Sequence, residues 1–382
     1  MTQPESEEAA RLPVVQPKDV VGVPVLPPAW LASLVIRGRA RMARVLRAGD
    51  PPPVRILEGL QGVLDTAALV ALCRIGVPER LSGRMEVDEL AGDLGVDPAR
   101  LRRLIRYAAA RGWVGLDRHG KVRPRPVITF LRADHPGGWR AWVEFMSGEE
   151  ILGAVSRLDT GMQDGGDPFA TAVGAPFFDW MEQHADRHAT FDAAMAAGGR
   201  MHGLVLARSL DWSKNQKVCD IGGGTGALLA TLLAAHPHLH GVVLDLPEVI
   251  GRVVATERMS AVGGDAFSQV PAGCDTYLLV NVLHDWSDED AARLLAVVAE
   301  AMSADDARGS RAVIVEGRTD HRARDEFAAR TDLLMFALTA GGRERSGEEF
   351  AELGSAVGLR LQDTVHLPSG SVAHVLRRAG AA

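Results

Sequence analysis

A short apolar segment that runs directly into a cluster of glycines constrains the fold more than any other feature of this sequence. Residues 217–221 (KVCDI) have the composition of a buried strand, and residues 222–226 (GGGTG) follow at once. Glycines let the backbone turn sharply from a strand into a helix and pass close to a ligand. Strand-like and helical segments then alternate at residues 227–236, 241–245, 247–259, 275–283, 288–303 and 311–316. This order predicts an α/β, Rossmann-like, doubly wound domain with a mostly parallel sheet.

The C-terminal end of the chain departs from this alternation. Residues 360–367 and 371–377 are two strand-like segments joined by Pro368, Ser369 and Gly370. Strands that follow one another across so short a connection are expected to pair antiparallel. We therefore expect an antiparallel hairpin at one edge of the sheet.

The first third of the chain has a mostly helical pattern. Residues 31–48 look helical up to a run of prolines, and residues 56–75 form a helix whose apolar positions cover more than one face. Such a helix is expected to be buried, either in this chain or against a partner subunit. Two shorter helices follow, the second with Asp97 as N-cap and Pro98 at its first position. A hairpin around His119 comes next, so this region predicts a winged helix.

Composition excludes several classes of protein. The 382 residues are 47% hydrophobic and 24% charged, which is typical of a folded globular protein. A formal net charge of −7 gives no overall attraction to nucleic acid or to an anionic membrane. The longest apolar runs, at residues 67–73 and at 228–235 with only Thr231 interrupting it, are far shorter than the roughly 18 residues of a membrane-spanning helix. The N-terminus does not resemble a secretory signal, and three scattered cysteines suit a reducing compartment, so we expect a cytoplasmic protein.

The glycine turn is compatible with two kinds of cofactor. Gly222-x-Gly224-x-x-Ala227 satisfies a relaxed dinucleotide fingerprint, which would place a pyrophosphate at the helix N-terminus. Asp220, however, lies two residues before the first glycine. A carboxylate there repels a pyrophosphate but accepts a hydrogen bond from an ammonium group. This residue favours S-adenosylmethionine (SAM) over a dinucleotide.

Acidic residues at the ends of the next two strands suit an adenosine ligand. Asp245 is placed where a carboxylate can hold two ribose hydroxyls, a feature that fits any adenosine-containing cofactor. Asp265 and Phe267 follow the next strand and offer a carboxylate for the adenine amine and an aromatic face for its ring. Together with Asp220, these positions favour SAM.

A histidine follows the buried strand-like segment at residues 275–283. Open α/β sheets bind ligands beyond the carboxyl ends of their strands, so His284 is placed where the chemistry is expected. An unperturbed histidine pKa near 6.5 suits a general base at neutral pH.

These motifs, in this order, resemble the SAM-dependent small-molecule O-methyltransferases. That family includes plant caffeate and flavonoid enzymes and bacterial antibiotic- and polyketide-tailoring enzymes. The resemblance covers about residues 40–380 and rests on DIGGGTG at 220–226, LDLP at 244–247, GDAF at 264–267 and LHDWSDE at 283–289. It implies methyl transfer from SAM to a hydroxyl of an aromatic or polyketide-like small molecule in secondary metabolism, which leaves S-adenosylhomocysteine.

The resemblance also implies roles for individual residues. His284 matches the general base, and Glu316 and Glu344 match two acidic residues that orient it. The candidate cofactor-binding residues are Asp220, Gly222, Gly224, Asp245, Leu246, Asp265, Ala266 and Phe267. The candidate substrate-contacting residues are Met195, Trp142 and Asp285. Plant members carry a lysine where this chain has Val280, so the residue that holds the cofactor's amino-acid end stays open.

In the resembled family the winged-helix domain intertwines two subunits, so we expect a homodimer. The expected parts are a mobile arm at residues 1–30, a winged-helix-like dimerisation domain at 31–135, connecting helices at 136–210 and a catalytic domain at 211–382. The connecting helices are expected to form part of the substrate pocket, with interruptions at residues 161–168 and 174–176.

Other interpretations stay open from the residues alone. A methyltransferase fold can use SAM without methyl transfer, for hydroxylation, decarboxylation or pericyclic chemistry. A SAM-responsive DNA-binding protein would use the arginines at positions 100, 102, 103, 106 and 111, although a solvated face is simpler on an acidic protein and we expect no nucleic-acid partner. His236, His238 and His240 could bind a metal, but an exposed loop is the simpler interpretation and we expect no metal site.

Overall fold

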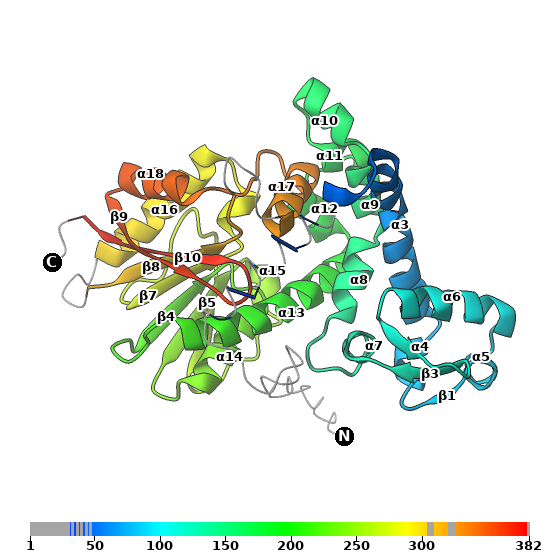
Figure 1. Cartoon of the computed structure of the whole chain (residues 1–382). Coiled ribbons are helices and arrows are strands. Elements are labelled where there is room, and N and C mark those ends of the chain that lie inside the picture. The colour runs from blue at the N-terminus through cyan, green and yellow to red at the C-terminus, as the bar shows by residue number, and fades with distance from the viewer. Residues whose placement is uncertain are drawn as a thin grey trace, which may run out of the picture.

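The computed structural model describes residues 48–303, 309–319 and 326–379, together with positions 31, 34, 35, 38, 41, 42 and 45. The arm expected at residues 1–30 lies outside the described residues. A large sheet with helices on both faces forms one side of the molecule, and a smaller, mostly helical region lies on the other side (Figure 1). The helices α8 to α13 connect the two.

The large sheet has seven strands in the order β6-β5-β4-β7-β8-β10-β9. The neighbouring pairs from β6 to β8 are all parallel, whereas β10 is antiparallel to both β8 and β9. The predictions of a mostly parallel doubly wound sheet and of an antiparallel hairpin at its edge are therefore confirmed. The strands are β4 (Lys217–Ile221), β5 (His240–Asp245), β6 (Met259–Gly263), β7 (Thr276–Val280), β8 (Arg311–Glu316), β9 (Leu359–His366) and β10 (Val372–Arg378).

Alternate side chains of the buried strands pack into two apolar layers, one on each face of the sheet, because successive residues of a strand point to opposite faces. Cys219 and Ile221 of β4 pack into the layer under α16 and α18, whereas Val218 packs into the layer under α13 and α14. Figure 1 shows these helix pairs on opposite faces of the sheet. The helices of this half are α14 (Ala227–Ala235), α15 (Pro247–Ile250), the one-turn 3₁₀ helix η1 (Leu283–Asp285), α16 (Asp288–Ser303), α17 (Glu326–Leu338) and α18 (Gly347–Ala356).

The N-terminal region contains the elements of the expected winged helix in the expected order. Gly95 ends one helix in the left-handed conformation, and the Asp97 side chain caps the next by accepting from the Arg100 backbone N–H at 2.8 Å. A three-stranded antiparallel sheet follows in the order β1-β3-β2. The elements are α3 (Pro52–Arg74), α4 (Val77–Arg80), β1 (Met85–Glu86), α5 (Val87–Leu94), α6 (Pro98–Ala110), β2 (Val114–Leu116), β3 (Lys121–Pro124) and α7 (Pro126–Phe130).

The connecting region is helical, but the prediction of an interruption beginning at Gly161 is wrong. Gly161 lies inside α10, where a Cβ atom would come within 2.7 Å of Pro168. This glycine serves close packing and does not form a turn. The helices are α8 (Arg140–Met146), α9 (Glu149–Val155), α10 (Leu158–Asp164), α11 (Pro168–Val173), α12 (Phe177–Gln183) and α13 (Ala185–Ser209).

Two elements beside the glycine turn are shorter than predicted. The strand expected at 275–283 ends at Val280, because Asn281 adopts a positive φ of 53° that a strand cannot continue through. The segment expected at 247–259 is helical only to Ile250. The early end of β7 allows the next residues to form η1, the turn that carries His284.

The helix α3 leaves a large apolar surface uncovered. Its buried residues are confined to the C-terminal half, namely Ala68, Leu72 and Cys73. The exposed apolar side chains of α3 and of the helical positions before it are Leu34, Val35, Met42, Val45, Val54, Ile56, Leu57, Leu60, Val63 and Leu64. By length and composition α3 is also the one described helix that could cross a membrane, although the sequence showed no unbroken apolar run of that length. So much exposed apolar surface indicates an interface.

Candidate active site

The expected functional residues gather at the carboxyl ends of the parallel strands. Asp220 is the last residue but one of β4, the glycine turn follows that strand, and His284 lies on η1, just after β7. Glu316 is the last residue of β8, and Glu344 comes from the segment between α17 and α18. Parallel strands bring these chain segments to a single edge of the sheet.

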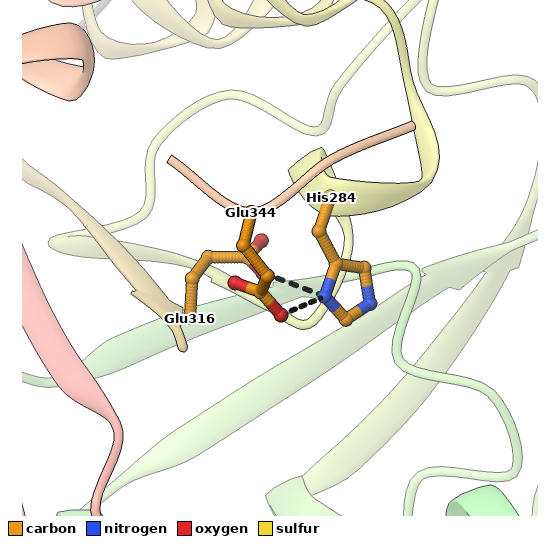
Figure 2. Close-up of side chains that lie close together, drawn as sticks. All are labelled: His284, Glu316 and Glu344. Atoms are coloured by element: carbon orange, nitrogen blue, oxygen red, sulfur yellow. Dashed lines mark hydrogen bonds and ion pairs between the residues drawn. The ribbon is translucent and has the colours of Figure 1, made fainter. Parts of the chain in front are cut away.

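His284 is held by two buried carboxylates (Figure 2). Its Nδ1 atom lies 3.1 Å from Oε1 of Glu344, a hydrogen bond, and 3.1 Å from Oε2 of Glu316, an ion pair. The two glutamates are 3% and 0% exposed, so the contact is shielded from water. The other Glu316 oxygen accepts from the backbone N–H groups of Val282 and Leu283, which fixes this carboxylate under the turn.

This arrangement sets both the tautomer and the charge of the imidazole. A ring nitrogen between two carboxylates must carry a proton, which leaves Nε2 as the acceptor when the ring is neutral. Burial opposes the charged ring, but Glu316, Asp285 and Glu344 outweigh burial and raise the pKa of His284 to about 10. Burial also raises the pKa of Glu316 to about 7, against the effect of His284. His284 is therefore a stronger base than the ordinary histidine that the sequence suggested.

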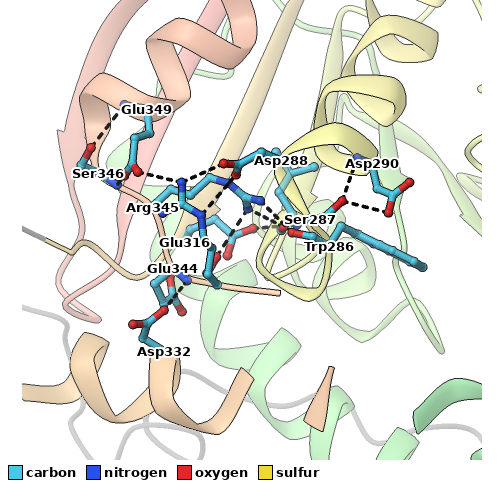
Figure 3. Close-up of polar contacts among 12 residues, drawn as sticks. Trp286, Ser287, Asp288, Asp290, Glu316, Asp332, Glu344, Arg345, Ser346 and Glu349 are labelled. Carbon is cyan, nitrogen blue, oxygen red and sulfur yellow. Dashed lines mark hydrogen bonds and ion pairs between the residues drawn. The ribbon is translucent and has the colours of Figure 1, made fainter. Parts of the chain in front are cut away.

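The turn that carries His284 is fixed by a buried arginine whose role the sequence did not reveal. Arg345 is fully buried and donates to the backbone carbonyls of Leu283 at 2.6 Å and Trp286 at 2.7 Å (Figure 3). Its Nε donates to Asp288 at 2.8 Å. Five donors in a rigid planar group allow one side chain to hold all three acceptors. The motif around Glu344 marked this segment, but the partners of Arg345 depend on tertiary structure.

Glu344 has a further support that the sequence also did not reveal. Its backbone N–H donates to Asp332 on α17 at 2.8 Å. Asp332 thereby fixes the segment that carries Glu344 relative to α17, as Figure 3 shows.

The glycine turn fits the amino-acid end of SAM. Asp220 is 2% exposed, and its Oδ2 atom has no hydrogen-bond partner among the residues that the structure describes. A Cβ atom on Gly223 would lie 2.8 Å from that oxygen, so a side chain there would crowd the carboxylate. Gly222 and Gly224 have φ values of 64° and 57°, which favour glycine. A buried carboxylate with a free oxygen suits an ammonium group, whereas a pyrophosphate would be repelled.

Asp245 and Asp265 stabilise their own turns. Asp245 accepts from the backbone N–H groups of Gly224 at 2.7 Å and Leu246 at 2.8 Å, and burial raises its pKa. Asp265 accepts from the Phe267 N–H at 2.9 Å and from the Ser268 hydroxyl at 2.8 Å. Carboxylate oxygens accept more than one hydrogen bond, so these contacts leave room for ribose and adenine donors. The cofactor roles of Asp245, Leu246, Asp265, Ala266 and Phe267 stay predictions.

The candidate substrate residues come from different elements. Trp142 of α8 and Met195 of α13 both pack against the apolar cluster of the connecting helices, with Phe145 and Phe177 at its centre. Asp285 is next to the base, with Oδ1 3.6 Å from the His284 Nε2 atom, and burial raises its pKa to about 6. Their contact with an acceptor stays a prediction.

The described residues include one cluster with the composition of a metal site. Single ligand atoms of His284, Glu316 and Glu344 lie within 4.8 Å of one another. The Nδ1 proton required by Glu344 is incompatible with a metal ion at the same nitrogen. His236 and His238 instead bond to the backbone carbonyls of Ala207 and Trp212, at 2.9 and 3.0 Å, which is a structural role. The expectation of no metal stays a prediction.

Comparison with known proteins gives a consistent result. Residues 155–360 match the O-methyltransferase domain family. The O-demethylpuromycin-O-methyltransferase of Streptomyces alboniger is 34% identical over 330 residues, which cover 83% of this chain and 86% of that protein. The 3-amino-4-hydroxybenzoate 4-O-methyltransferase of Streptomyces cremeus is 31% identical over 330 residues, which cover 84% and 89%. The S-adenosylhomocysteine-bound structure of CalO1, a methyltransferase in calicheamicin biosynthesis, superposes with a TM-score of 0.77 at 29% identity and covers 86% of this chain and 98% of that chain.

The free carboxylate oxygen of Asp220 predicts that this residue lowers the stability of the ligand-free protein and strengthens the binding of SAM. Burial raises the pKa of Asp220 from 3.8 to about 7. The folded protein thus binds this proton more tightly than the unfolded chain, and the ligand-free protein loses stability as pH rises from about 4 to 7. We expect Asp220→Asn to raise the Tm of ligand-free protein at pH 8, by roughly 2–4 °C for each kcal/mol recovered, while it weakens SAM binding.

The matched control is Asp363→Asn, which removes an exposed carboxylate on β9. Differential scanning calorimetry from pH 5 to 8 should show a Tm gain that grows with pH for Asp220→Asn only. A pH-independent difference, or a lower Tm at pH 8, would contradict the assignment of Asp220 as a destabilising buried carboxylate.

Proposed function

Because the chain belongs to the family of SAM-dependent O-methyltransferases, we propose that it transfers a methyl group to a hydroxyl of an aromatic or polyketide-like small molecule, with His284 as general base. One observation carries the assignment of the base. Two buried carboxylates fix the Nδ1 proton of His284 at the carboxyl ends of the strands, which leaves Nε2 to accept a proton. We propose secondary metabolism as the setting, since the relatives named above act on an antibiotic precursor and a hydroxybenzoate.

The chain's own groups would hold the cofactor and move one proton. Asp220, the glycine turn, Asp245 and the segment at residues 264–267 are the candidate cofactor-binding groups. SAM supplies an activated methyl group on a sulfonium. A phenol has a pKa near 10, as tyrosine does, and is a poor nucleophile at pH 7 until its proton leaves. His284 has a pKa raised to a similar value, so in molecules whose Nε2 is unprotonated it can take that proton at little energetic cost, and the fraction of such molecules grows as pH rises.

Positioning is expected to supply much of the remaining acceleration. Alignment of two reactants in one site is worth up to roughly 7–11 kcal/mol. Arg345 and Glu316 contribute by fixing η1, so that the base does not have to reorganise. Phe178 of α12 and Trp286 stack with centroids 6.0 Å apart and planes at 16°, which puts flat aromatic surface two residues from the base. This surface supports an aromatic acceptor.

Removal of the base should separate turnover from cofactor binding. We expect His284→Ala to bind SAM nearly as wild type does and to turn over about 10²–10⁴-fold more slowly. Calorimetry measures the binding, and mass spectrometry measures a 14-dalton gain on phenols after incubation with SAM.

An acidic nitrophenol is the matched control for this substitution. It is already largely ionised at mildly alkaline pH, so it needs no base and should lose much less turnover in His284→Ala. An equal loss on both kinds of phenol, or no loss on either, would remove His284 from proton transfer.

The carboxylates predict a shift of the pH profile. Turnover should rise with pH as the proton leaves Nε2 of His284. The rising limb of the pH–rate profile should lie at a higher pH than the ordinary histidine pKa. Glu316→Gln removes a negative charge beside the ring, so it lowers the pKa of His284 and should move the limb to lower pH. Rates from pH 6 to 10 with one acceptor test this, with Glu348→Gln, an exposed residue of α18, as the control. A limb that stays in place or moves upward would contradict the electrostatic account.

We propose that the uncovered apolar surface of α3 is covered by a second copy of the chain. Leu60 and Val63 are 67% and 66% exposed, and apolar residues at this exposure are costly to leave in water. The N-terminal region would then be the dimerisation domain, and the family resemblance supports this arrangement. The alternative is that a lipid bilayer covers this surface.

The state of the cysteines bears on the location of the protein. Cys73, Cys219 and Cys274 are free and buried, which supports a cytoplasmic location.

Charges on α3 should break the assembly. Wild type is expected to have twice the chain mass by light scattering at micromolar concentration, and Leu60→Glu with Val63→Glu should give a folded monomer. Val262→Glu, at an exposed apolar residue of the edge strand β6, should stay dimeric. A monomeric wild type contradicts the proposal, and flotation with anionic lipid vesicles would assign α3 to a membrane instead.

A further inference from the structure

A second histidine lies at the carboxyl-end edge of the sheet and takes no part in the proton transfer described above. His202 belongs to α13 and is 6% exposed. Its Nε2 atom lies 3.3 Å from the Nδ2 atom of Asn281, the residue whose positive φ ends β7. Its Nδ1 atom is buried and has no hydrogen-bond partner within the described ranges 48–303, 309–319 and 326–379.

The contact with Asn281 determines what the free nitrogen can do. An amide nitrogen only donates, so the Nε2 atom of His202 accepts. Burial lowers the pKa of His202 to about 4, with a further contribution from His284, so the ring is neutral at pH 7. A neutral imidazole that accepts at Nε2 carries its proton at Nδ1. The free atom is therefore a donor, and a buried donor without an acceptor costs about 1–3 kcal/mol.

The position of His202 relates this donor to the glycine turn. The neighbouring residues of α13 pack closely on the start of α14, which follows the turn: a Cβ atom on Gly199 would lie 3.3 Å from the Leu228 nitrogen, and one on Gly203 would lie 2.6 Å from the Leu228 oxygen. Asn281 ends β7, which pairs directly with β4, the strand of Asp220. His202 thus lies at the same sheet edge as the free oxygen of Asp220.

The unpartnered Nδ1 donor of His202 and the unpartnered acceptor oxygen of Asp220 lie at the same edge of the sheet. Together they complement a zwitterion, which carries one carboxylate and one ammonium group. We propose that His202 donates from Nδ1 to the α-carboxylate of SAM, while Asp220 accepts from its α-ammonium group. This inference rests on the proposed function, because it requires SAM at the glycine turn. Asn281 is the positioning residue that fixes the tautomer.

Two neighbouring residues are the other candidates for this contact. Val280, directly before Asn281, has an apolar side chain. Arg200, two residues before His202, donates from one terminal nitrogen to the Gly137 carbonyl at 3.3 Å, in the loop before α8, and its Nε atom has no hydrogen-bond partner in the part of the chain that the structure describes. The bond to Gly137 directs this guanidinium toward that loop, so His202 is the donor that we place at the glycine turn. An isolated hydrogen bond to a charged group typically changes affinity by roughly ten- to a hundredfold.

Three ligands separate recognition of the carboxylate from recognition of the rest of SAM. Calorimetry is performed on the full chain with SAM, with decarboxylated SAM, which lacks only the carboxylate, and with 5′-methylthioadenosine, which lacks the whole amino-acid end. Wild type should prefer SAM over decarboxylated SAM. His202→Leu should reduce SAM affinity by roughly ten- to a hundredfold and leave the other two affinities unchanged, so that the preference is lost.

Two further variants test the specific atom. His202→Asn places an amide N–H near the position of Nδ1 and should restore part of the preference. His374→Leu replaces another buried histidine, on β10, whose ring nitrogens have no hydrogen-bond partner among the described residues, and it should keep the full preference.

A preference unchanged in His202→Leu would overturn the inference, and so would an equal loss for all three ligands, which would indicate a structural role for the ring. If wild type binds 5′-methylthioadenosine and SAM equally well, the proposed function stands and the carboxylate contact is wrong. If wild type binds none of the three while folded, both proposals fail.

Discussion

The contact of two buried carboxylates with one ring nitrogen of His284 is the interaction on which the rest of this site depends. Charged groups taken out of water are stable only when they are paired and hydrogen-bonded. The chain meets this condition with backbone donors to Glu316 and with Asp332 against the Glu344 backbone. Arg345 fixes the turn above them. The end of β8, the turn after β7 and the segment before α18 are therefore arranged around one imidazole.

Other groups at the same edge are left incomplete. Asp220 keeps a free acceptor and His202 a free donor, although both side chains are more than nine-tenths buried. Unpaired buried polar atoms lower stability and persist where a ligand completes them. The two sets of groups differ in how they are held. His284, Glu316 and Glu344 each have at least one polar partner within the protein, whereas the free oxygen of Asp220 and the Nδ1 atom of His202 have none among the described residues.

The sequence predicts this architecture well where local signals and tertiary structure agree. The limits of β4, α16 and β8 match the expected segments, and the Asp97 cap and the Gly95 helix end are as expected. Prediction from the sequence fails where tertiary packing determines the local structure. Gly161 is read by pattern as a helix break but lies in a helix contact, and Asn281 ends a strand by a backbone conformation that no apolar pattern reveals. Arg345 looks like any surface arginine in sequence and is fully buried.

The protonation of His284 tests the central claim most directly. Nitrogen-15 NMR of histidine-labelled protein, with His284→Gln to assign the signals, distinguishes the two ring nitrogens across a pH titration. We predict that Nδ1 keeps its proton throughout while Nε2 loses its own at a pH above the ordinary histidine value. A neutral ring with the proton on Nε2 would contradict the account, because Nε2 could not then accept a proton from the acceptor hydroxyl. A titration below the ordinary value would also contradict it, because the two carboxylates would then not raise the pKa of the ring.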